Sequence, residues 1–431
     1  MKGFLKLSPL PLFLLLYIGM CLLGGDFSHS SITLVAFMLA SVYAIAISRG
    51  SINDRLSAYS RGAGSTTVLL MVWIYVLAGA FAFCAKQMGC LDATVNLTLQ
   101  LLPPSLLLPG IFLSACFVSL AVGTSVGTIV QLVPIAAGIA MKTDVPMPLM
   151  VAVVVGGAYF GDNLSFISDT TIAATQTQGC QMRDKFRANL RLVLPVAIVM
   201  LVLYYMIGKD ISVTQQIPAA QPLLVVPYLV VIVASLLGMH VMLVLLLGLL
   251  LSGTIGICQG SMDLFGWFDG MGQGMIGMGE MVVMAMLAAG LLELIRQNGG
   301  IDWLLHHLTR NIRTRRGAEL GIASLVCLVN VCTANNTVAI LTSGPIARQL
   351  AEKYQITPQR SASILDTVSC FTQGLLPYGV QILLAAGLAT EALQADMPDA
   401  PALSPVSIVP WLFYPMGIGV AVLLSALIRK R

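Results

Sequence analysis

Long apolar stretches separated by short polar segments run along nearly the whole chain. Apolar runs recur from residue 8 to residue 428, and many approach the length of about 20 residues that a helix needs to cross a bilayer. Several runs are short or fused with a neighbour, so the pattern predicts about 11–13 transmembrane helices. We therefore expect an all-α polytopic membrane protein that forms a single transmembrane domain over residues 1–431.

The composition supports this membrane assignment. Hydrophobic residues make up 57% of the 431 residues and charged residues only 10%, whereas a soluble protein of this length needs far more charge to cover its surface. The first apolar run follows Lys2 and Lys6, and no cleavage site of small residues follows it. We therefore predict a first transmembrane helix at this position and no signal peptide.

Several other classes of protein are disfavoured. The net charge of +4 lies in particular loops, and no basic patch on a soluble face is available to bind nucleic acid. The nine cysteines are scattered singly, without a CxxC pair, so neither a disulfide framework nor a zinc site is indicated. No nucleophile elbow, HExxH motif or phosphate loop is present. We expect neither an enzyme nor a bound cofactor.

Basic residues cluster in four places, which the positive-inside rule assigns to the cytoplasm. The segments Gly24–Ser31, Lys86–Leu101 and Lys209–Pro222 are poor in basic residues and are assigned to the outside. This pattern predicts a multi-pass protein of the inner (plasma) membrane with a cytoplasmic N-terminus. The four clusters are Arg49, Arg55 and Arg61; Arg183, Lys185, Arg187 and Arg191; Arg296, Arg310, Arg313, Arg315 and Arg316; and Arg429–Arg431.

Two segments of the chain share one pattern. In Phe112–Ala136 and again in Ala323–Ala347, an apolar helix leads into a small polar break and then into Pro-Ile-Ala, at Pro134 and Pro345. The first segment starts from a loop assigned to the outside and the second from a loop assigned to the inside. Opposed orientation of similar segments is the signature of an inverted-repeat transporter, although chance similarity between apolar segments is the alternative. The repeat cores would cover residues 105–208 and 317–428.

Four polar breaks interrupt apolar runs in these two regions. They are Gly123–Thr128, Gly161–Thr171, Thr333–Ala339 and Thr372–Gln381. Backbone can leave a helix at membrane depth only where it lines protein or water, and its freed carbonyls then become oxygen ligands. The breaks therefore predict a cation site near the membrane midplane. The alternative for Gly161–Thr171 is a polar loop just outside the membrane.

The candidate ligands are carboxylate, amide and hydroxyl oxygens, which hard monovalent cations prefer. Asp162 and Asp169 are the predicted acids that hold either a transported Na⁺ or a proton, and Asp169 is the better candidate for ion contact because hydroxyls surround it. Asp366 is either a third carboxylate or the partner of an arginine. The hydroxyl of Tyr378 either completes the site or merely caps it. The other candidates are Asn163, Ser165, Ser168, Thr170, Thr171, Thr124, Ser125, Asn335 and Asn336.

At these residues the chain resembles the NhaC-type Na⁺/H⁺ antiporters, a family within a wider superfamily of ion transporters with inverted repeats. The GDK-x-SPLSDTT-like segment of the family is matched by Gly161, Asp162, Ser165, Ser168, Asp169, Thr170 and Thr171. Its GTSWGT-like break is matched by Gly123, Thr124, Ser125, Gly127 and Thr128, and Asp366 resembles its second-half acid. The resemblance extends over nearly the full length, with its most specific motifs within residues 112–175.

Three departures from the family pattern concern the charge of the site. Asn163 stands where the family has lysine, Phe166 and Ile167 replace Pro-Leu, and the break TANNTVAI lacks the commoner aspartate. Losing the lysine puts the choice of ion and the exchange stoichiometry in question. The pattern is that of a divergent branch.

The resemblance implies a secondary-active antiporter that moves Na⁺, and also Li⁺, out of the cytoplasm in exchange for H⁺. The alternative is a Na⁺- or H⁺-coupled exchanger of small organic anions or amino acids, which should place a fixed positive charge in the core; Asn163 argues against it. A structural or receptor-like membrane protein would not need four paired polar breaks. The expected partners are Na⁺, H⁺ and the lipid bilayer, and the sequence leaves a homodimer open.

Overall fold

The structure is a computed structural model, and it describes residues 3–24, 30–165, 168–213, 221–237, 239–300, 303 and 313–428. Within these residues the chain is helical, and the extended pairing found there is one isolated antiparallel bridge between Thr143 and Val213. The predicted all-α class is thereby confirmed. Lys2, Phe166, Ile167, Arg310 and Arg429–Arg431 lie outside the described residues.

The first half of the chain forms a series of helices joined by short turns. They are η1 (Gly3–Lys6), α1 (Pro9–Gly24), α2 (Ser30–Ile47), α3 (Ile52–Ala63), α4 (Thr66–Gln87), α5 (Cys90–Leu101), η2 (Pro104–Leu106), α6 (Leu107–Val122), α7 (Ser125–Lys142), α8 (Met147–Leu164), α9 (Asp169–Gln178) and α10 (Met182–Gly208).

The second half continues in the same manner. Its helices are α11 (Pro222–Leu236), α12 (Val241–Gln259), α13 (Leu264–Gly277), α14 (Gly279–Gln297), α16 (Arg315–Thr333), α17 (Asn336–Lys353), α18 (Pro358–Leu375), α19 (Val380–Asp396), α20 (Pro405–Ile408), η3 (Val409–Trp411) and α21 (Phe413–Ile428).

Among the described residues, eight helical segments are long and apolar enough to cross a membrane, or up to ten if two bent pairs each count as one span. This number is lower than the 11–13 expected from the sequence. One reason is that neighbouring apolar runs join into long broken segments, such as Met147–Gln178 and Pro358–Asp396. Another is that the apolar helices Leu34–Ile47 and Pro222–Ala234 are shorter than a full span.

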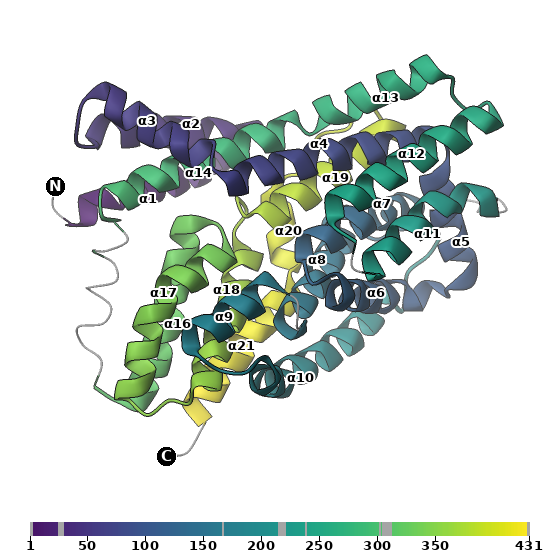
Figure 1. Cartoon of the computed structure of the whole chain (residues 1–431). Helices are drawn as coiled ribbons and strands as arrows, with labels where there is room; N and C mark the ends of the chain where they lie inside the picture. The colour runs from purple at the N-terminus through teal and green to yellow at the C-terminus, as the bar shows by residue number, and fades with distance from the viewer. Residues whose placement is uncertain are drawn as a thin grey trace.

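The helices form two groups that lie side by side. Figure 1 shows α2, α3, α4, α13 and α14 along one side of the molecule, with α8, α9, α16, α17 and α18 on the other. Helix α19 packs against α4 of the first group and against α7 and α8 of the second. The broken helices α6–α9 and α16–α19 thus lie next to a layer of long helices that includes α4, α13 and α14.

Small residues let α6 and α8 approach closely. A Cβ added at Gly157 would lie 2.5 Å from the Cβ of Ala115, and one added at Gly161 would lie 2.1 Å from the Oγ of Ser119. The hydroxyl of Ser119 also donates a hydrogen bond to the carbonyl of Ala158 at 2.6 Å. Close backbone approach through small residues and interhelical hydrogen bonds is how helices associate in a bilayer. This packing fixes the end of α8, where the predicted ion site lies.

The breaks that end α6 and α16 have the same backbone form. Gly123 and Ala334 are left-handed, with φ of 73° and 47°, and the next residues, Thr124 and Asn335, are extended with φ of −146°. A left-handed residue ends a helix by turning its backbone out of the helical path. Both breaks therefore stop one helix and start the next within three residues.

The spacing of the later helices is also repeated. Helices α7, α8 and α9 begin at Ser125, Met147 and Asp169, and α17, α18 and α19 begin at Asn336, Pro358 and Val380, each 211 positions later. The equal spacing supports the proposed division into repeat cores at residues 105–208 and 317–428. At this spacing Asp162 of the first core corresponds to Gln373 of the second.

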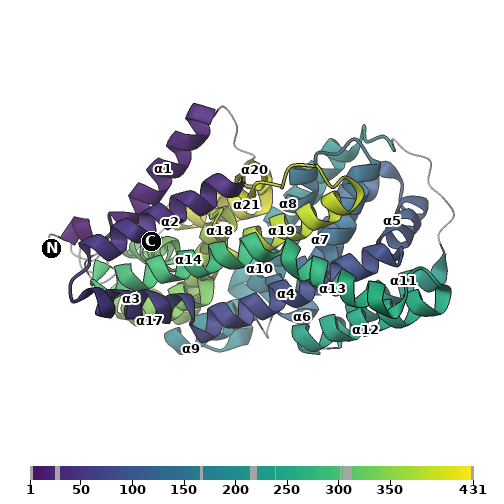
Figure 2. The same ribbon diagram turned by 90° about the horizontal axis from the view of Figure 1, so that it is seen from above.

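Loops of opposite predicted sidedness lie apart in the molecule. Helices α3 and α17 lie toward one end, and α5 and α11 toward the other, in two perpendicular views, and α16 lies beside α17 (Figures 1 and 2). Arg55 and Arg61 are on α3 and Arg315 and Arg316 on α16, whereas α5 occupies most of the segment Lys86–Leu101. The long axis of the molecule is therefore the direction we propose for the membrane normal.

Labelling with a membrane-impermeant thiol reagent tests this orientation. In a variant without its own cysteines, a cysteine at Leu101 should react in intact cells, and one at Arg313 should react only after the membrane is opened. Leu101 ends a segment poor in basic residues and Arg313 lies in a basic cluster, and the positive-inside rule places these two segments on opposite sides of the membrane. Equal reactivity of both positions in intact cells would contradict the inverted repeat.

Candidate functional site

The polar residues of the first half converge where α8 ends. Helix α8 stops at Leu164, and α9 starts at Asp169. The start of α7, the first turns of α10 and the middle of α18 supply the other contacts to this point. An α-helix that ends inside the protein leaves its last carbonyls without partners from its own backbone. Side chains from the neighbouring helices supply those partners.

Asp162 is the buried acid at the centre of this point, with 3% of its surface exposed. Its Oδ1 accepts a hydrogen bond from the backbone N–H of Ser125 at 3.0 Å and lies 3.5 Å from the Oγ of Ser168. Ser125 opens α7, so the carboxylate lies at a helix N-terminus, where the partial positive charge of the helix favours an anion. The Asp162 carboxylate is therefore buried next to the break and close to the N-terminus of α7.

Hydroxyl groups of the break gather around the backbone of Asp162. The Oγ1 atoms of Thr170 and Thr171 each lie 3.3 Å from the Asp162 carbonyl, and the Oγ atoms of Ser168 and Thr170 are 3.0 Å apart. Ser165 donates to the carbonyl of Leu120 on α6 at 2.9 Å. The structure therefore places the predicted hydroxyls together and buried, with Ser165 turned toward α6.

Asp169 has a different environment from Asp162. It is the first residue of α9, and its side chain is exposed. Helix α8 ends at Leu164 and α9 begins at Asp169, so the two acids lie on separate helices. The buried, hydrogen-bonded carboxylate at this break is therefore that of Asp162, and the Asp169 side chain is exposed.

A buried ion pair, Lys185–Asp366, lies next to this point. The Lys185 Nζ is 2.7 Å from the Asp366 Oδ2, and the side chains are 1% and 0% exposed. Asn189 also donates to the Asp366 Oδ2 at 2.7 Å. Of the two roles predicted for Asp366, partnership with a cation is the one observed, although the partner is a lysine and not an arginine.

Lys185 and Asn189 are the site residues that sequence reasoning missed. The sequence counted Lys185 only as a charge of the cytoplasmic basic cluster, whereas its side chain is buried and paired within the protein. A signal for this position is present in the sequence. Lys185 and Asn189 are four residues apart and extend the buried stripe of α10, which continues through Val193, Val196, Met200 and Tyr204.

Lys185 also returns a positive charge to the position where Asn163 replaces the family lysine. Its Nζ lies 3.0 Å from the Asn163 carbonyl and 2.6 Å from the Oγ1 of Thr171. The Asn163 amide donates to the carbonyl of Tyr159 at 2.9 Å and lies 3.3 Å from the hydroxyl of Tyr414. The charge is thus supplied from α10, two helices further along the chain than the position that the motif predicts.

A chain of amides links the two halves of the protein. Gln381 donates to the Oγ of Ser125 at 3.2 Å, and Gln373 donates to Gln381 at 3.1 Å and to the carbonyl of Ala334 at 2.9 Å. Thr124, the N-cap residue of α7, accepts through its carbonyl from Thr128. Because Ser125 also binds Asp162, the helix breaks of both halves are connected to the buried acid.

The second-half asparagines serve their own helix. Asn335 is the N-cap of α17, and its Oδ1 accepts from the N–H of Val338 at 3.0 Å, while the Asn336 Oδ1 accepts from Thr337 at 3.1 Å. The hydroxyl of Tyr378 donates to the carbonyl of Val331 at 2.8 Å. Tyr378 thus satisfies a carbonyl near the end of α16. The structure does not bring these three residues into hydrogen-bond contact with Asp162.

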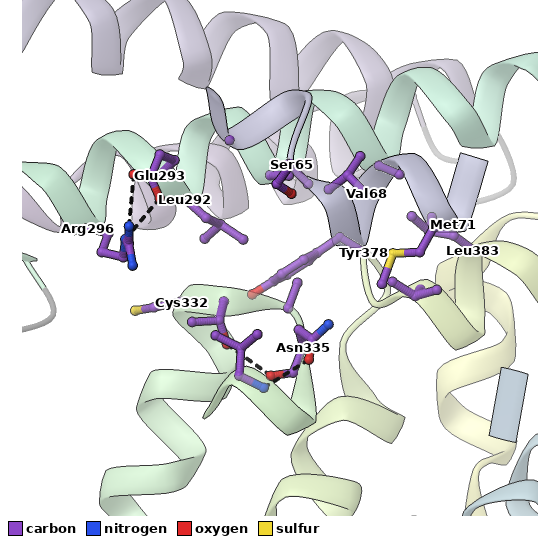
Figure 3. A pocket seen from close by; sticks show the side chains of 18 of the residues that line it. Ser65, Val68, Met71, Leu292, Glu293, Arg296, Cys332, Asn335, Tyr378 and Leu383 are labelled. Atoms are coloured by element: carbon purple, nitrogen blue, oxygen red, sulfur yellow. Dashed lines mark hydrogen bonds and ion pairs between the residues drawn. The ribbon is translucent and has the colours of Figure 1, made fainter. Parts of the chain in front are cut away.

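Asn335 and Tyr378 instead line a pocket of about 430 Å³ between α3–α4, α14 and the α16–α17 break. Figure 3 shows the Tyr378 ring between Ser65, Val68 and Met71 on one side and Cys332 and Asn335 on the other. Arg61 also lines this pocket, as do Glu293 and Arg296, which form an ion pair at 2.9 Å. The pocket has room for a small organic molecule and is distinct from the surroundings of Asp162.

The groups recorded around Asp162 are hydroxyls and backbone groups. Within the described residues, no group of three or more His, Cys, Asp or Glu side chains could hold a metal ion. The cluster around Asp162 consists of one carboxylate with hydroxyls and backbone groups. Broken helices that meet at a buried acid inside a multi-span helical fold define a secondary membrane transporter.

Comparison with known proteins gives the family. The family model described as the Na⁺/H⁺ antiporter family matches residues 8–209 and 212–416, and the chain belongs to this family. The protein is therefore an antiporter-family member and a multi-pass protein of the inner membrane, which agrees with the resemblance inferred from the sequence.

Individual relatives carry different cargoes. The Na⁺/H⁺ antiporter NhaC of Alkalihalophilus pseudofirmus is 25% identical over 72% of this chain and 74% of its own length. A malate-2H⁺/Na⁺-lactate antiporter of Bacillus subtilis is 21% identical over 75% of each chain. An arginine/ornithine antiporter of Halobacterium salinarum is 21% identical over 86% of this chain and 84% of its own length.

The role of Asn335 as a helix cap can be tested by its stability effect. Asn335→Ala removes the capping oxygen and should lower the stability by about 1 kcal/mol, whereas Asn335→Ser keeps a capping oxygen and should lose less. Thermal unfolding of the detergent-purified variants measures both. Equal losses for Ala and Ser would show that the cap contributes little.

Proposed function

We propose that this protein is a secondary-active antiporter that exchanges cytoplasmic Na⁺, and also Li⁺, for external H⁺ at Asp162. The observation that carries the proposal is a buried carboxylate at a helix break, with the Ser168 hydroxyl beside it and the Thr170 and Thr171 hydroxyls at the backbone carbonyl of the same residue. Membership of the Na⁺/H⁺ antiporter family supports the same cargo. The N-terminus would lie in the cytoplasm, as the basic loops indicate.

The exchange follows from the cost of burying a bare carboxylate. An unpaired anion in a buried, membrane-embedded position is unfavourable, and either a proton or a cation bound to it removes that cost. Both ligands use the same oxygens of Asp162, so binding of one excludes the other. Mutually exclusive binding is the requirement for antiport, because a site that holds both ligands would carry them in the same direction.

Asp366 is neutralised by its ion pair with Lys185, so Asp162 is the buried acid of the break that is available for exchange. The ammonium of Lys185 and the carboxylate of Asp366 are 2.7 Å apart. The break residues Thr124, Ser125, Asn163 and Ser165 would position the helix ends around this acid, whereas Asn335 and Asn336 would support the second-half break, to which Gln373 and Gln381 connect the site.

A second candidate function is exchange of a small organic ion. The pocket of about 430 Å³ near Arg61, Arg296, Asn335 and Tyr378 favours it, because a sodium ion needs no space of that size. The relatives named for malate and lactate or for arginine and ornithine point in the same direction. Everted vesicles challenged in turn with Na⁺, Li⁺, K⁺, malate, lactate, arginine and ornithine separate the two candidates by which solute moves protons.

Charge removal at the two acids of the break should have unequal effects. Asp162→Asn should reduce Na⁺-driven proton flux to background, because the amide can neither bind a proton nor neutralise a cation. The matched variant Asp169→Asn changes an exposed side chain and should retain flux within about threefold of wild type. Immunoblots of the same vesicles control for insertion. Loss of flux only in Asp169→Asn would return the exchange role to Asp169.

The competition between the two ligands predicts a dependence on pH. Raising the pH removes the competing proton from Asp162, so the apparent KM for Na⁺ should fall, by up to about tenfold per pH unit where the protonated form predominates. Flux measured at several Na⁺ concentrations across the pH range gives this slope. A KM that stays constant while the maximal rate changes would contradict binding at one shared carboxylate.

A further inference from the structure

The ammonium of Lys185 is surrounded by oxygen atoms. Its three nearest partners are a carboxylate oxygen of Asp366 at 2.7 Å, the carbonyl of Asn163 at 3.0 Å and the hydroxyl of Thr171 at 2.6 Å. An ammonium has three N–H donors and no acceptor, so these three oxygens satisfy it. Carboxylate, carbonyl and hydroxyl oxygens are also the groups that bind a hard monovalent cation.

The surroundings of the ammonium contain more acceptors than donors. Asn189 gives its amide donors to the Asn163 carbonyl at 2.8 Å and to the Asp366 Oδ2 at 2.7 Å. The buried Oδ1 atoms of Asn163, Asn189 and Asp366 have no hydrogen-bond partner among the described residues. A buried cluster with spare oxygens has an affinity for positive charge.

This cluster is continuous with the acid proposed for exchange. Asp162 and Asn163 are consecutive residues of the last turn of α8, and Thr171 contacts both the carbonyl of Asp162 and the ammonium of Lys185. A cation bound to Asp162 and the Lys185 ammonium therefore occupy neighbouring positions. The negative end of α8 faces the ammonium, which favours a cation there.

We propose that the ammonium of Lys185 permanently occupies a second monovalent-cation position, built from Asp366, Asn163 and Thr171, and thereby limits exchange to one ion at Asp162. The proposal rests on the proposed function for the identity of the exchanged ion, but the second position is a property of the Lys185 cluster itself. It assigns Lys185 as the residue that sets the number of ions carried. Without its tethered charge, the same oxygens would bind a mobile Na⁺.

Removal of the lysine side chain is the direct test. Lys185→Ala leaves the Asp366 carboxylate unpaired and opens space at its oxygens, so Na⁺ should stabilise this variant more than it stabilises wild type. At about 100-fold excess over Kd, binding to the vacated position should raise Tm by on the order of 3 °C beyond the wild-type shift. Purified protein in sodium chloride and in choline chloride gives the comparison. If Lys185→Ala can be purified in a folded state only in sodium buffer, that result would also support stabilisation of the variant by Na⁺.

A charge-matched control separates a cation position from a structural ion pair. The double variant Lys185→Ala, Asp366→Asn has the same space without the buried negative charge, and the additional sodium-dependent shift should vanish in it. An equal sodium shift in the single and double variants, or no additional shift in Lys185→Ala, would overturn the proposal. Lys185→Gln, which fills more of the space, should show a smaller sodium effect than Lys185→Ala.

A further variant separates this proposal from the proposed function. In Asp162→Asn, Lys185→Ala the exchange site is removed, yet the sodium-dependent shift from the second position should remain. If Asp162→Asn alone retains exchange, the proposed function is wrong, while the shift in this double variant still decides the Lys185 proposal. In Lys185→Ala vesicles with an intact Asp162, the Hill coefficient for Na⁺ should rise from about 1 toward about 2. A Hill coefficient that stays near the wild-type value despite measurable flux would contradict the limit on ion number.

Discussion

The end of α8 inside the protein is the constraint on which the rest of the site depends. Backbone carbonyls at membrane depth must find donors within the protein. The carbonyl of Asp162 takes its donors from Thr170 and Thr171 on α9, and that of Asn163 takes them from Lys185 and Asn189 on α10. Lys185 in turn requires the carboxylate of Asp366 on α18. The interruption of α8 thus requires contacts from three other helices, α9, α10 and α18, at one place.

The close packing of α6 on α8 makes this arrangement possible. Gly157 and Gly161 bring the backbones together, and Ser119 bonds to the carbonyl of Ala158 across the contact. The break after α6 then places Ser125, the first residue of α7, against the carboxylate of Asp162. The position of the acid is therefore a consequence of small residues in the turn and a half of α8 that precede it. A larger residue at either glycine would shift the acid together with its helix.

Local sequence patterns were sufficient to predict where the helices break. They were insufficient to predict which side chains from different helices contact one another. Small polar residues interrupting apolar runs correctly indicated the breaks after α6, α8 and α16, because backbone conformation depends on nearby residues. Asp169 was preferred for its hydroxyl neighbours, but adjacency in sequence does not determine on which side of a new helix the first residue lies. Lys185 was counted as a loop charge, since charge counting takes no account of the buried stripe that it extends. Its partner Asp366 is 181 positions later in the chain, and no local pattern pairs them.

The neutral pair of Lys185 and Asp366 has an electrical consequence. Because their charges cancel, the net charge of the proposed site is that of Asp162 and its ligand. With Na⁺ or H⁺ bound, this charge is zero, and moving the loaded site through the membrane field requires no electrical work. The empty site carries one negative charge, and crossing a potential of 100 mV would change its energy by about 2.3 kcal/mol. The membrane voltage would therefore act on the unloaded form of the carrier, and one-for-one exchange would proceed without net movement of charge.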